Sequence, residues 1–196
     1  MAELGKLEYY LLAINVIGAL VYLINMLLYR HTARGQIDVV VTIVSLLGGS
    51  AGMLLMILLF DRKAEKENMM SRVFIICVFI IQIIILLIYK GHHAEHFTFA
   101  FWKFFAEHRI LLIYLGVINL VTFIVFAIDK ANARVNRSRI RIVTLLGLSF
   151  AGGSVGGLIS MYLFRHKTQK DYFTVGMPLI IVMQVVVLLY VMNAGW

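Results

Sequence analysis

The chain has 196 residues, of which 62% are hydrophobic and only 14% are charged. A soluble domain carries about a quarter charged residues, so this composition excludes an ordinary soluble protein and predicts an integral membrane protein. The formal net charge of +8 suits loops that lie beside anionic membrane lipids. The basic residues are scattered over short connections instead of covering one face, so we do not expect nucleic-acid binding.

Six apolar runs without a charged residue follow one another along the chain. At about 1.5 Å per residue, each is long enough to cross most or all of a hydrocarbon core about 30 Å thick. The runs are residues 9–29, 39–60, 73–89, 110–128, 142–164 and 172–195. We therefore expect an all-α integral membrane protein with six transmembrane helices. No cleavage site of small residues follows the first run, so we expect a retained helix and not a signal peptide.

The two halves of the chain are related by an internal repeat. A shift of 104 residues places Gly48-Gly49-Ser50 on Gly152-Gly153-Ser154, Gly52 on Gly156, and Asn15 on Asn119. We therefore expect two three-helix repeats, residues 1–90 and 109–196, joined by an interfacial aromatic linker at 91–108. If every run crosses fully, an odd number of spans per repeat inverts the second repeat relative to the first, as in many transporters.

The glycines in the middle run of each repeat allow two interpretations. A continuous helix would carry a stripe of small residues that lets helices pack closely, whereas a re-entrant hairpin would turn at the glycine pair. Full crossings divide the Lys and Arg residues ten to eight between the two membrane faces, and hairpins divide them fourteen to four. The positive-inside rule prefers the hairpins. We favour continuous helices, because re-entrant backbone must be shielded from lipid. The expected packing residues are Ser45, Gly48, Gly49, Gly52, Ser149, Gly152, Gly153, Gly156 and Gly157.

Carboxamide side chains lie within the apolar runs at equivalent places in the two repeats. An unpaired carboxamide in hydrocarbon costs several kcal/mol, so each must find a hydrogen-bond partner. The partner is either a neighbouring helix or a solute bound at a polar site near the membrane midplane, at the repeat interface. The four residues are Asn15, Gln82, Asn119 and Gln184. Ionisable residues are missing from the middle of every run, which argues against a proton relay or a charged-substrate pump.

Charged residues cluster where the fourth and fifth runs end. They serve either as juxtamembrane anchors or as a site for an anion or a lipid headgroup, in which His166 titrates near neutral pH. The cluster consists of Asp129, Lys130, Arg139, Arg165, His166, Lys167, Thr168 and Lys170. A nucleotide phosphate loop is excluded, because the glycines and the basic residues are separated by an apolar stretch.

The linker at 91–108 is rich in Phe and Trp, which predicts a segment at the depth of the lipid headgroups. His92, His93 and His96 are weak metal-ligand candidates, because they lack a specific metal-binding spacing. We expect no cofactor. No nucleophile–base–acid set is readable in the sequence, so the residues by themselves assign no enzyme activity.

Residues 111–184 resemble a bacterial membrane family catalogued as domain of unknown function 1294. The resemblance depends on the order of its motifs: Tyr114, Ile118-Asn119, Asp129-Lys130, Ala133, Arg139, Leu145, Gly152-Gly153, Gly156, Met161, Phe164 to Thr168, Lys170, Phe173, Pro178 and Gln184. It implies a multi-pass protein of the bacterial inner membrane and assigns no activity.

The chain departs from the family pattern in both halves. Ile140-Arg141-Ile142 replaces the usual Ile-Pro-Glu, which puts a role for the glutamate in doubt. The first half is a diverged copy, with Asn25-Met26 in place of Asp-Lys and Asp61-Arg62-Lys63 in place of Arg-His-Lys.

Three functional hypotheses follow. The first is a small transporter or channel for a solute or ion. The second is a non-catalytic interaction or assembly protein, which includes a homodimer. The third is a protein or enzyme that binds anionic membrane lipids through Arg165, His166 and Lys167.

Overall fold

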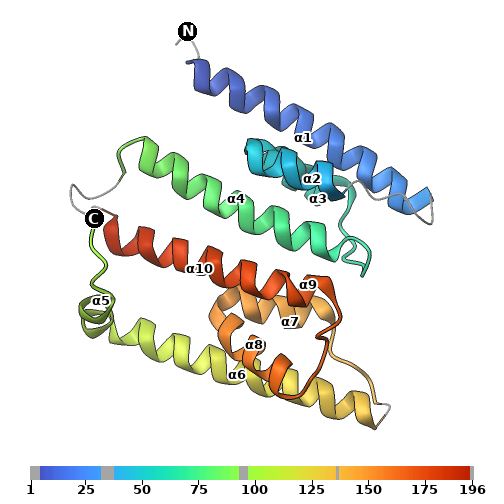
Figure 1. Cartoon of the computed structure of the whole chain (residues 1–196), viewed down its shortest axis with the longest axis vertical. Helices are drawn as coiled ribbons and strands as arrows, with labels where there is room; N and C mark the ends of the chain where they lie inside the picture. The colour runs from blue at the N-terminus through green and yellow to red at the C-terminus, as the bar shows by residue number, and fades with distance from the viewer. Residues whose placement is uncertain (1–4, 32–37, 93–96, 136, 195–196) are drawn as a thin grey trace. The chain divides into compact units, whose positions relative to one another are not determined.

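The computed structural model describes residues 5–31, 38–92, 97–135 and 137–194, and all regular structure in these ranges is helical. The chain divides into two compact units, Met1–Ile85 and Leu86–Trp196 (Figure 1). The first unit consists of α1 (Lys6–His31), α2 (Asp38–Val44), a π-helical turn η1 (Ser45–Gly49), α3 (Ser50–Phe60) and most of α4 (Met69–Tyr89). The second contains α5 (Phe101–Glu107), α6 (Arg109–Arg134), α7 (Ile142–Leu148), a π-helical turn η2 (Ser149–Gly153), α8 (Ser154–Leu163), α9 (Asp171–Thr174) and α10 (Gly176–Asn193).

Six helical stretches of the described chain are long and apolar enough to cross a membrane, if each broken stretch is counted as one. They are Lys6–His31, Asp38–Phe60, Met69–Tyr89, Arg109–Arg134, Ile142–Leu163 and Asp171–Asn193. The prediction of a multi-pass helical membrane protein is confirmed at this level.

The middle stretch of each unit is not one helix. Gly48 has a φ of 117° and Gly152 a φ of 116°, a backbone conformation that only glycine adopts without strain. Each break separates two short helices, α2 from α3 and α7 from α8. The prediction of a continuous helix through the glycines is therefore wrong.

In the second unit, the two arms of the broken stretch fold back on each other. Tyr114 bonds Ala151, Asn119 bonds Gly156, and Phe123 bonds Ser160, each pair being 37 residues apart. A constant separation means that α8 runs parallel to α6, because antiparallel helices would have a constant sum of residue numbers. The chain leaves α6 at its far end, so α7 must first run back. Figure 1 shows both arms beside α6.

Both ends of this helical hairpin meet at one residue near the end of α6. The Asp129 carboxylate accepts a hydrogen bond from the Ile140 amide, just before α7, at 2.8 Å. Its other oxygen lies 2.7 Å from Nε2 of His166, just after α8. A stretch that crossed a membrane would have its ends about 30 Å apart. The two ends of residues 142–163 instead lie at the same end of the unit.

The first unit repeats the arrangement. Tyr10 bonds the Leu47 carbonyl and Asn15 bonds Gly52, again with a separation of 37 residues. At the other end, the start of α4 contacts both ends of the hairpin. Ser71 lies 3.3 Å from Asp38 at the start of α2, and Arg72 lies 3.2 Å from Asp61 at the end of α3.

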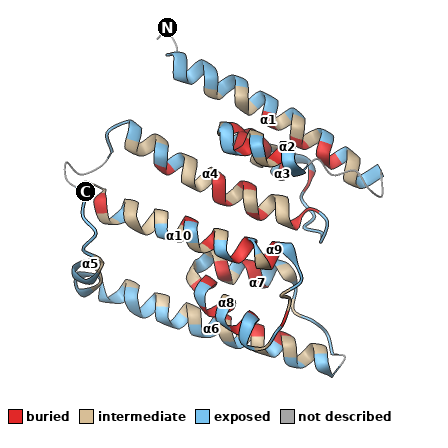
Figure 2. Cartoon of the chain, viewed as in Figure 1, coloured by how far each residue is buried: buried red, intermediate tan, exposed pale blue. Residues whose placement is uncertain are grey.

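The hairpins form the cores of the two units. In the first, Tyr22 and Met26 of α1 pack with Val41, Met53 and Ile57 of the hairpin and Ile75 of α4. In the second, Phe126 of α6 meets Phe173 of α9 with ring centroids 5.6 Å apart. Buried residues gather on the hairpins and the helix faces beside them (Figure 2). The outer face of α1 exposes an apolar stripe: Leu12, Val16, Leu20, Ile24 and Leu27.

Candidate functional site

The turn of the second hairpin is held by Asn119 of α6. Its Oδ1 accepts a hydrogen bond of 2.7 Å from the Gly156 amide, in the first turn of α8. Its Nδ2 donates to the Gly152 and Leu115 carbonyls, both at 2.8 Å. A helix end leaves amides and carbonyls without partners inside the helix, and these need partners in an apolar environment. One carboxamide satisfies a free group on each side of the break.

Gln184 of α10 satisfies the other side of the same turn. Its Nε2 donates to the Ser149 carbonyl at 2.7 Å and to the Phe150 carbonyl at 3.2 Å, which belong to the end of the first arm. Its Oε1 accepts from the Ser154 hydroxyl at the start of the second arm. Tyr114 donates to the Ala151 carbonyl at 2.6 Å.

The turn of the first hairpin is held in the same way. Asn15 accepts from the Gly52 amide at 2.7 Å and donates to the Leu11 carbonyl at 2.8 Å. Gln82 donates to the Ser45 carbonyl at 2.7 Å and accepts from the Ser50 hydroxyl. The four predicted carboxamides are thus placed in equivalent positions, and their hydrogen bonds lie within their own units.

The glycines that follow each turn lie where the second arm touches the first helix of the unit. A Cβ on Gly52 would overlap the Asn15 carbonyl, and one on Gly156 would overlap the Asn119 carbonyl. Gly49 lies against Gly18, Gly153 against Thr122, and Gly157 against Met177 and Phe126. Ser149 donates to the Leu145 carbonyl, whereas the Ser45 hydroxyl is buried without a partner. The small residues allow the backbones of parallel helices to approach closely.

The base of the second hairpin is a buried ionic cluster. Asp129 is fully buried and lies 2.7 Å from both His166 Nε2 and Lys167 Nζ. The Lys167 ammonium also lies 5.1 Å from the centre of the Phe173 ring, a cation–π contact. Burial lowers the pKa of the Lys167 ammonium below its usual range, although Asp129 acts in the opposite direction. The carboxylate joins α6 to both ends of the hairpin.

The loop after α8 adopts an unusual backbone to make these contacts. Arg165 has a φ of 44° and Lys167 a φ of 61°, both in the left-handed region that non-glycine residues rarely occupy. Such residues persist where surrounding contacts over-determine them, often at functional sites. Here the twist directs His166 and Lys167 to the same carboxylate, while Arg165 is exposed.

The remaining basic residues of the predicted cluster surround this base without entering it. The Lys130 ammonium lies 3.4 Å from the Arg165 carbonyl. Arg139 and Lys170 are exposed, and Thr168 is half-buried in the turn closed by the Lys170 amide and the Lys167 carbonyl. Arg139 is close enough for its charge to lower the pKa of Lys167, after the larger effect of burial. The structure thus separates the ionic cluster of Asp129, His166 and Lys167 from an exposed basic rim, which consists of Arg139, Arg165 and Lys170.

The first unit builds a different cluster at the same end. Asp61, at the end of α3, accepts from the Tyr22 hydroxyl at 2.7 Å and from Asn68 at 3.0 Å, and it lies 3.4 Å from Arg30. Burial alone would raise the pKa of the Asp61 carboxyl, but hydrogen bonds from Tyr29 and Tyr22 and the charge of Arg72 hold it below its usual range.

The sequence alone did not identify the role of Asp61. Asp129 aligns with Asn25, and Asp61 aligns with Arg165, so the acid has moved from the first helix of the unit to the end of its hairpin. The sequence did contain one signal for this role: Asp61 is acidic where the second unit has the basic Arg165. Its partners Asn68 and Arg72 come from the start of α4 and its approach, where the repeat is too diverged to predict contacts.

No group of three or more possible metal ligands occurs in the described part of the chain. His92 follows α4, whereas His93 and His96 lie outside the described residues. Trp102, in the linker helix α5, is 90% exposed.

Comparison with known families matches part of the second unit. A family model described as "Protein of unknown function (DUF1294)" matches residues 119–173. The uncharacterized protein YsdA of Bacillus subtilis (strain 168) is 35% identical over 79 residues, which cover 40% of this chain and 89% of YsdA. No solved structure matches this chain.

The family match begins at the turn-binding Asn119 and contains Asp129, the whole hairpin and the His166–Lys167 pair. YsdA is similar to this chain over most of its own length but over less than half of the chain. The chain therefore belongs to the family described as protein of unknown function (DUF1294).

Proposed function

We propose that the protein is a multi-pass protein of the bacterial inner membrane that binds anionic phospholipid headgroups at the basic ends of its units. In this proposal each unit crosses the membrane twice, and its hairpin is re-entrant. The observation that carries the proposal is the contact of Asp129 with both ends of the second hairpin.

The topology supports a parallel duplication instead of the inverted repeat expected from six full crossings. The Thr98 backbone amide donates to Asn193 Oδ1 at 2.6 Å, and Asn193 Nδ2 donates to the Thr98 carbonyl at 3.1 Å. The second unit thus begins and ends on one side. A unit with two crossings returns the chain to the side from which it started, so the next unit enters in the same sense.

This topology collects the positive charge on one membrane face. By sequence position, four of the 18 Lys and Arg residues fall near the other ends of the long helices: Lys6, Lys90, Lys103 and Arg109. The remaining 14 fall in or beside the connections that flank the hairpins. The positive-inside rule makes that face cytoplasmic. A basic residue near an anionic leaflet contributes about 1 kcal/mol to lipid binding, so the exposed rim provides substantial attraction.

Cysteine labelling tests the topology. In a Cys77→Ser background, Ser138→Cys precedes α7 and Gln169→Cys follows α8, and both positions are exposed. We expect a membrane-impermeant maleimide to label both cysteines in inside-out vesicles, which expose the cytoplasmic face, and neither in right-side-out vesicles. Labelling of the two positions from opposite sides would refute the hairpin topology.

Lipid retention tests the headgroup proposal separately. The protein is purified in mixed micelles of a mild detergent with phosphatidylcholine and phosphatidylglycerol, and bound lipid is measured by native mass spectrometry. We expect enrichment of phosphatidylglycerol that falls in the Arg139→Gln/Arg165→Gln/Lys170→Gln variant. The control is Lys103→Gln/Arg109→Gln, which changes a residue of α5 and the first residue of α6. Equal enrichment in both variants would contradict the proposal.

Transport of a small solute or ion is the second candidate. The broken helices favour it, because discontinuous helices form the substrate sites of many transporters. The carboxamides that suggested a midplane site are occupied by the hairpin turns, so transport requires another path. It predicts flux in proteoliposomes that depends on the protein, and a tight bilayer at high protein density would exclude it.

A further inference from the structure

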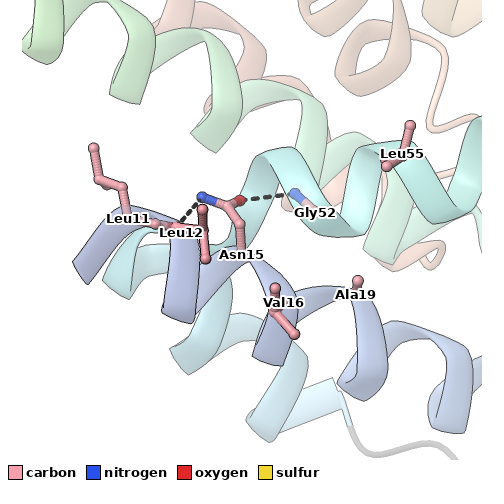
Figure 3. A pocket seen from close by; sticks show the side chains of 7 residues that line it. All are labelled: Leu11, Leu12, Asn15, Val16, Ala19, Gly52 and Leu55. Carbon is pink, nitrogen blue, oxygen red and sulfur yellow. Dashed lines mark hydrogen bonds between the residues drawn. The ribbon is translucent and has the colours of Figure 1, made fainter. Parts of the chain in front are cut away.

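The outer side of the first unit carries an apolar groove beside the hairpin turn. It has a volume of about 390 Å³ and lies between α1 and α3 (Figure 3). The volume is within the range of small-molecule sites, roughly 300–1,000 Å³. Its lining consists of Leu11, Leu12, Asn15, Val16, Ala19, Gly52 and Leu55.

The groove has little capacity left for hydrogen bonding. Asn15, its one polar side chain, already uses its Oδ1 for the Gly52 amide and its Nδ2 for the Leu11 carbonyl, as Figure 3 shows. A polar solute would therefore exchange water for hydrocarbon without gaining partners. The chemistry of the groove requires an apolar occupant.

The groove is continuous with the surface that faces lipid. Leu12 and Val16 on one rim and Leu55 on the other are 60%, 55% and 52% exposed, and the stripe on α1 continues to Leu20. These residues lie within stretches that are long and apolar enough to cross a membrane. The material beside the groove in a bilayer is hydrocarbon, so access requires no opening.

The second unit carries a large side chain at the position that opens the groove. The repeat places Phe123 on Ala19, while Asn119 and Gly156 keep the places of Asn15 and Gly52. Phe123 packs with Phe164, ring centroids 5.8 Å apart, beside α8. Both units thus conserve the contact between carboxamide and glycine amide, but only the second has an aromatic side chain at this position.

We propose that the groove binds one acyl chain of a membrane phospholipid, which covers the Asn15–Gly52 contact of the first unit. Ala19 leaves space beside the contact at the position where the repeat puts Phe123 in the second unit. Occupancy fills the space beside the hydrogen bond at the hairpin turn and stabilises the first unit. This site is independent of headgroup charge.

A photoactivatable phospholipid tests the proposal. Phosphatidylcholine with a diazirine in one acyl chain is added to delipidated protein in mild detergent, and cross-linked peptides are mapped by mass spectrometry. We expect saturable labelling of the segments that contain residues 11–19 and 52–55, with competition by unlabelled lipid. Ala19→Phe and Val16→Phe, which fill the groove from two positions on α1, should abolish the saturable part. Leu20→Phe, a matched change on the exposed stripe, should leave it intact.

Thermal stability gives a second readout. Added phosphatidylcholine should raise the Tm of the wild type by about 3 °C or more, and the rise should disappear in Ala19→Phe, which supplies its own filling group. The converse variant, Phe123→Ala, should increase the lipid-dependent rise.

Labelling that never saturates would overturn the proposal, since that is the behaviour of ordinary surrounding lipid. Equal saturable labelling in Ala19→Phe and Leu20→Phe would overturn it as well. If lipid labels other segments and a second copy of the chain covers these residues, cross-links between copies will identify that occupant and exclude the acyl chain.

Discussion

Replacing Asn119 by Leu tests whether this carboxamide holds the hairpin turn or serves a solute. The substitution keeps the size of the side chain and removes the acceptor of the Gly156 amide and the donor to the Gly152 carbonyl. Each buried group left without a partner costs about 1–3 kcal/mol, and interhelical hydrogen bonds in membranes average nearer 0.6 kcal/mol. We expect a loss of about 2–4 kcal/mol in the free energy of unfolding.

The first unit offers a matched comparison. Asn15 bonds the Gly52 amide and the Leu11 carbonyl, whereas Asn119 also bonds the Gly152 carbonyl across the break. The carbonyls of Leu11 and Leu115 lie inside helices, so losing the hydrogen bond from the Asn side chain to either carbonyl costs little free energy. Asn15→Leu should therefore cost less than Asn119→Leu, by about 1 kcal/mol.

Unfolding by sodium dodecyl sulfate in mixed micelles, followed by far-ultraviolet circular dichroism, measures both losses. Leu120→Ala, on the lipid-facing side of α6 at 60% exposure, is the control and should cost little. Wild-type stability in Asn119→Leu, or a larger loss in Asn15→Leu, would refute the assignment of the turn. Loss of flux at full stability would instead support a solute site.

Three further predictions concern packing and charge. Gly156→Ala should cost about 2 kcal/mol or more, because a Cβ would overlap the Asn119 carbonyl. Gly147→Ala, where a Cβ meets nothing within 4 Å, should be neutral or stabilising by about 0.5–1 kcal/mol. The same detergent titration measures both variants, and equal effects would contradict the close approach of the helices at Gly156. Asp129→Asn and Lys167→Met should each cost about 3–5 kcal/mol, since each breaks the ion pair inside the unit by removing one partner. The double variant should cost clearly less than the sum, and simple additivity would show that the pair is not coupled. The lowered pKa of Asp61 stabilises the fold above its unfolded pKa of about 3.9, and this contribution is lost as the pH falls through the folded pKa; the Tm of the wild type should thus fall below about pH 4 more steeply than that of Asp61→Asn, and parallel curves would show that Asp61 is not the responsible group.

The sequence alone determined the class of the protein and the places where its polar groups gather. Apolar runs of this length require a membrane, and the internal repeat predicted that Asn15 and Asn119 hold equivalent places, as do Gln82 and Gln184 once a gap of two residues is allowed. It also indicated that the glycine pair is either a packing surface or a turn. The motif of Asp129, His166 and Lys167 was visible as a set, because a shared order of residues needs no structure.

Only the tertiary structure decided that the middle runs turn back. The same small residues suit a continuous helix and a hairpin, since a glycine reveals the freedom of the backbone and not the angle that it adopts. The choice depends on whether Asn119 and Gln184, from two other helices, reach the amides and carbonyls freed at Gly152. The same holds for Asp61, whose partners Tyr22 and Asn68 are 39 and 7 residues away. Polar groups in hydrocarbon must form hydrogen bonds with partners that lie within about 3 Å, and which groups come that close depends on the folded chain.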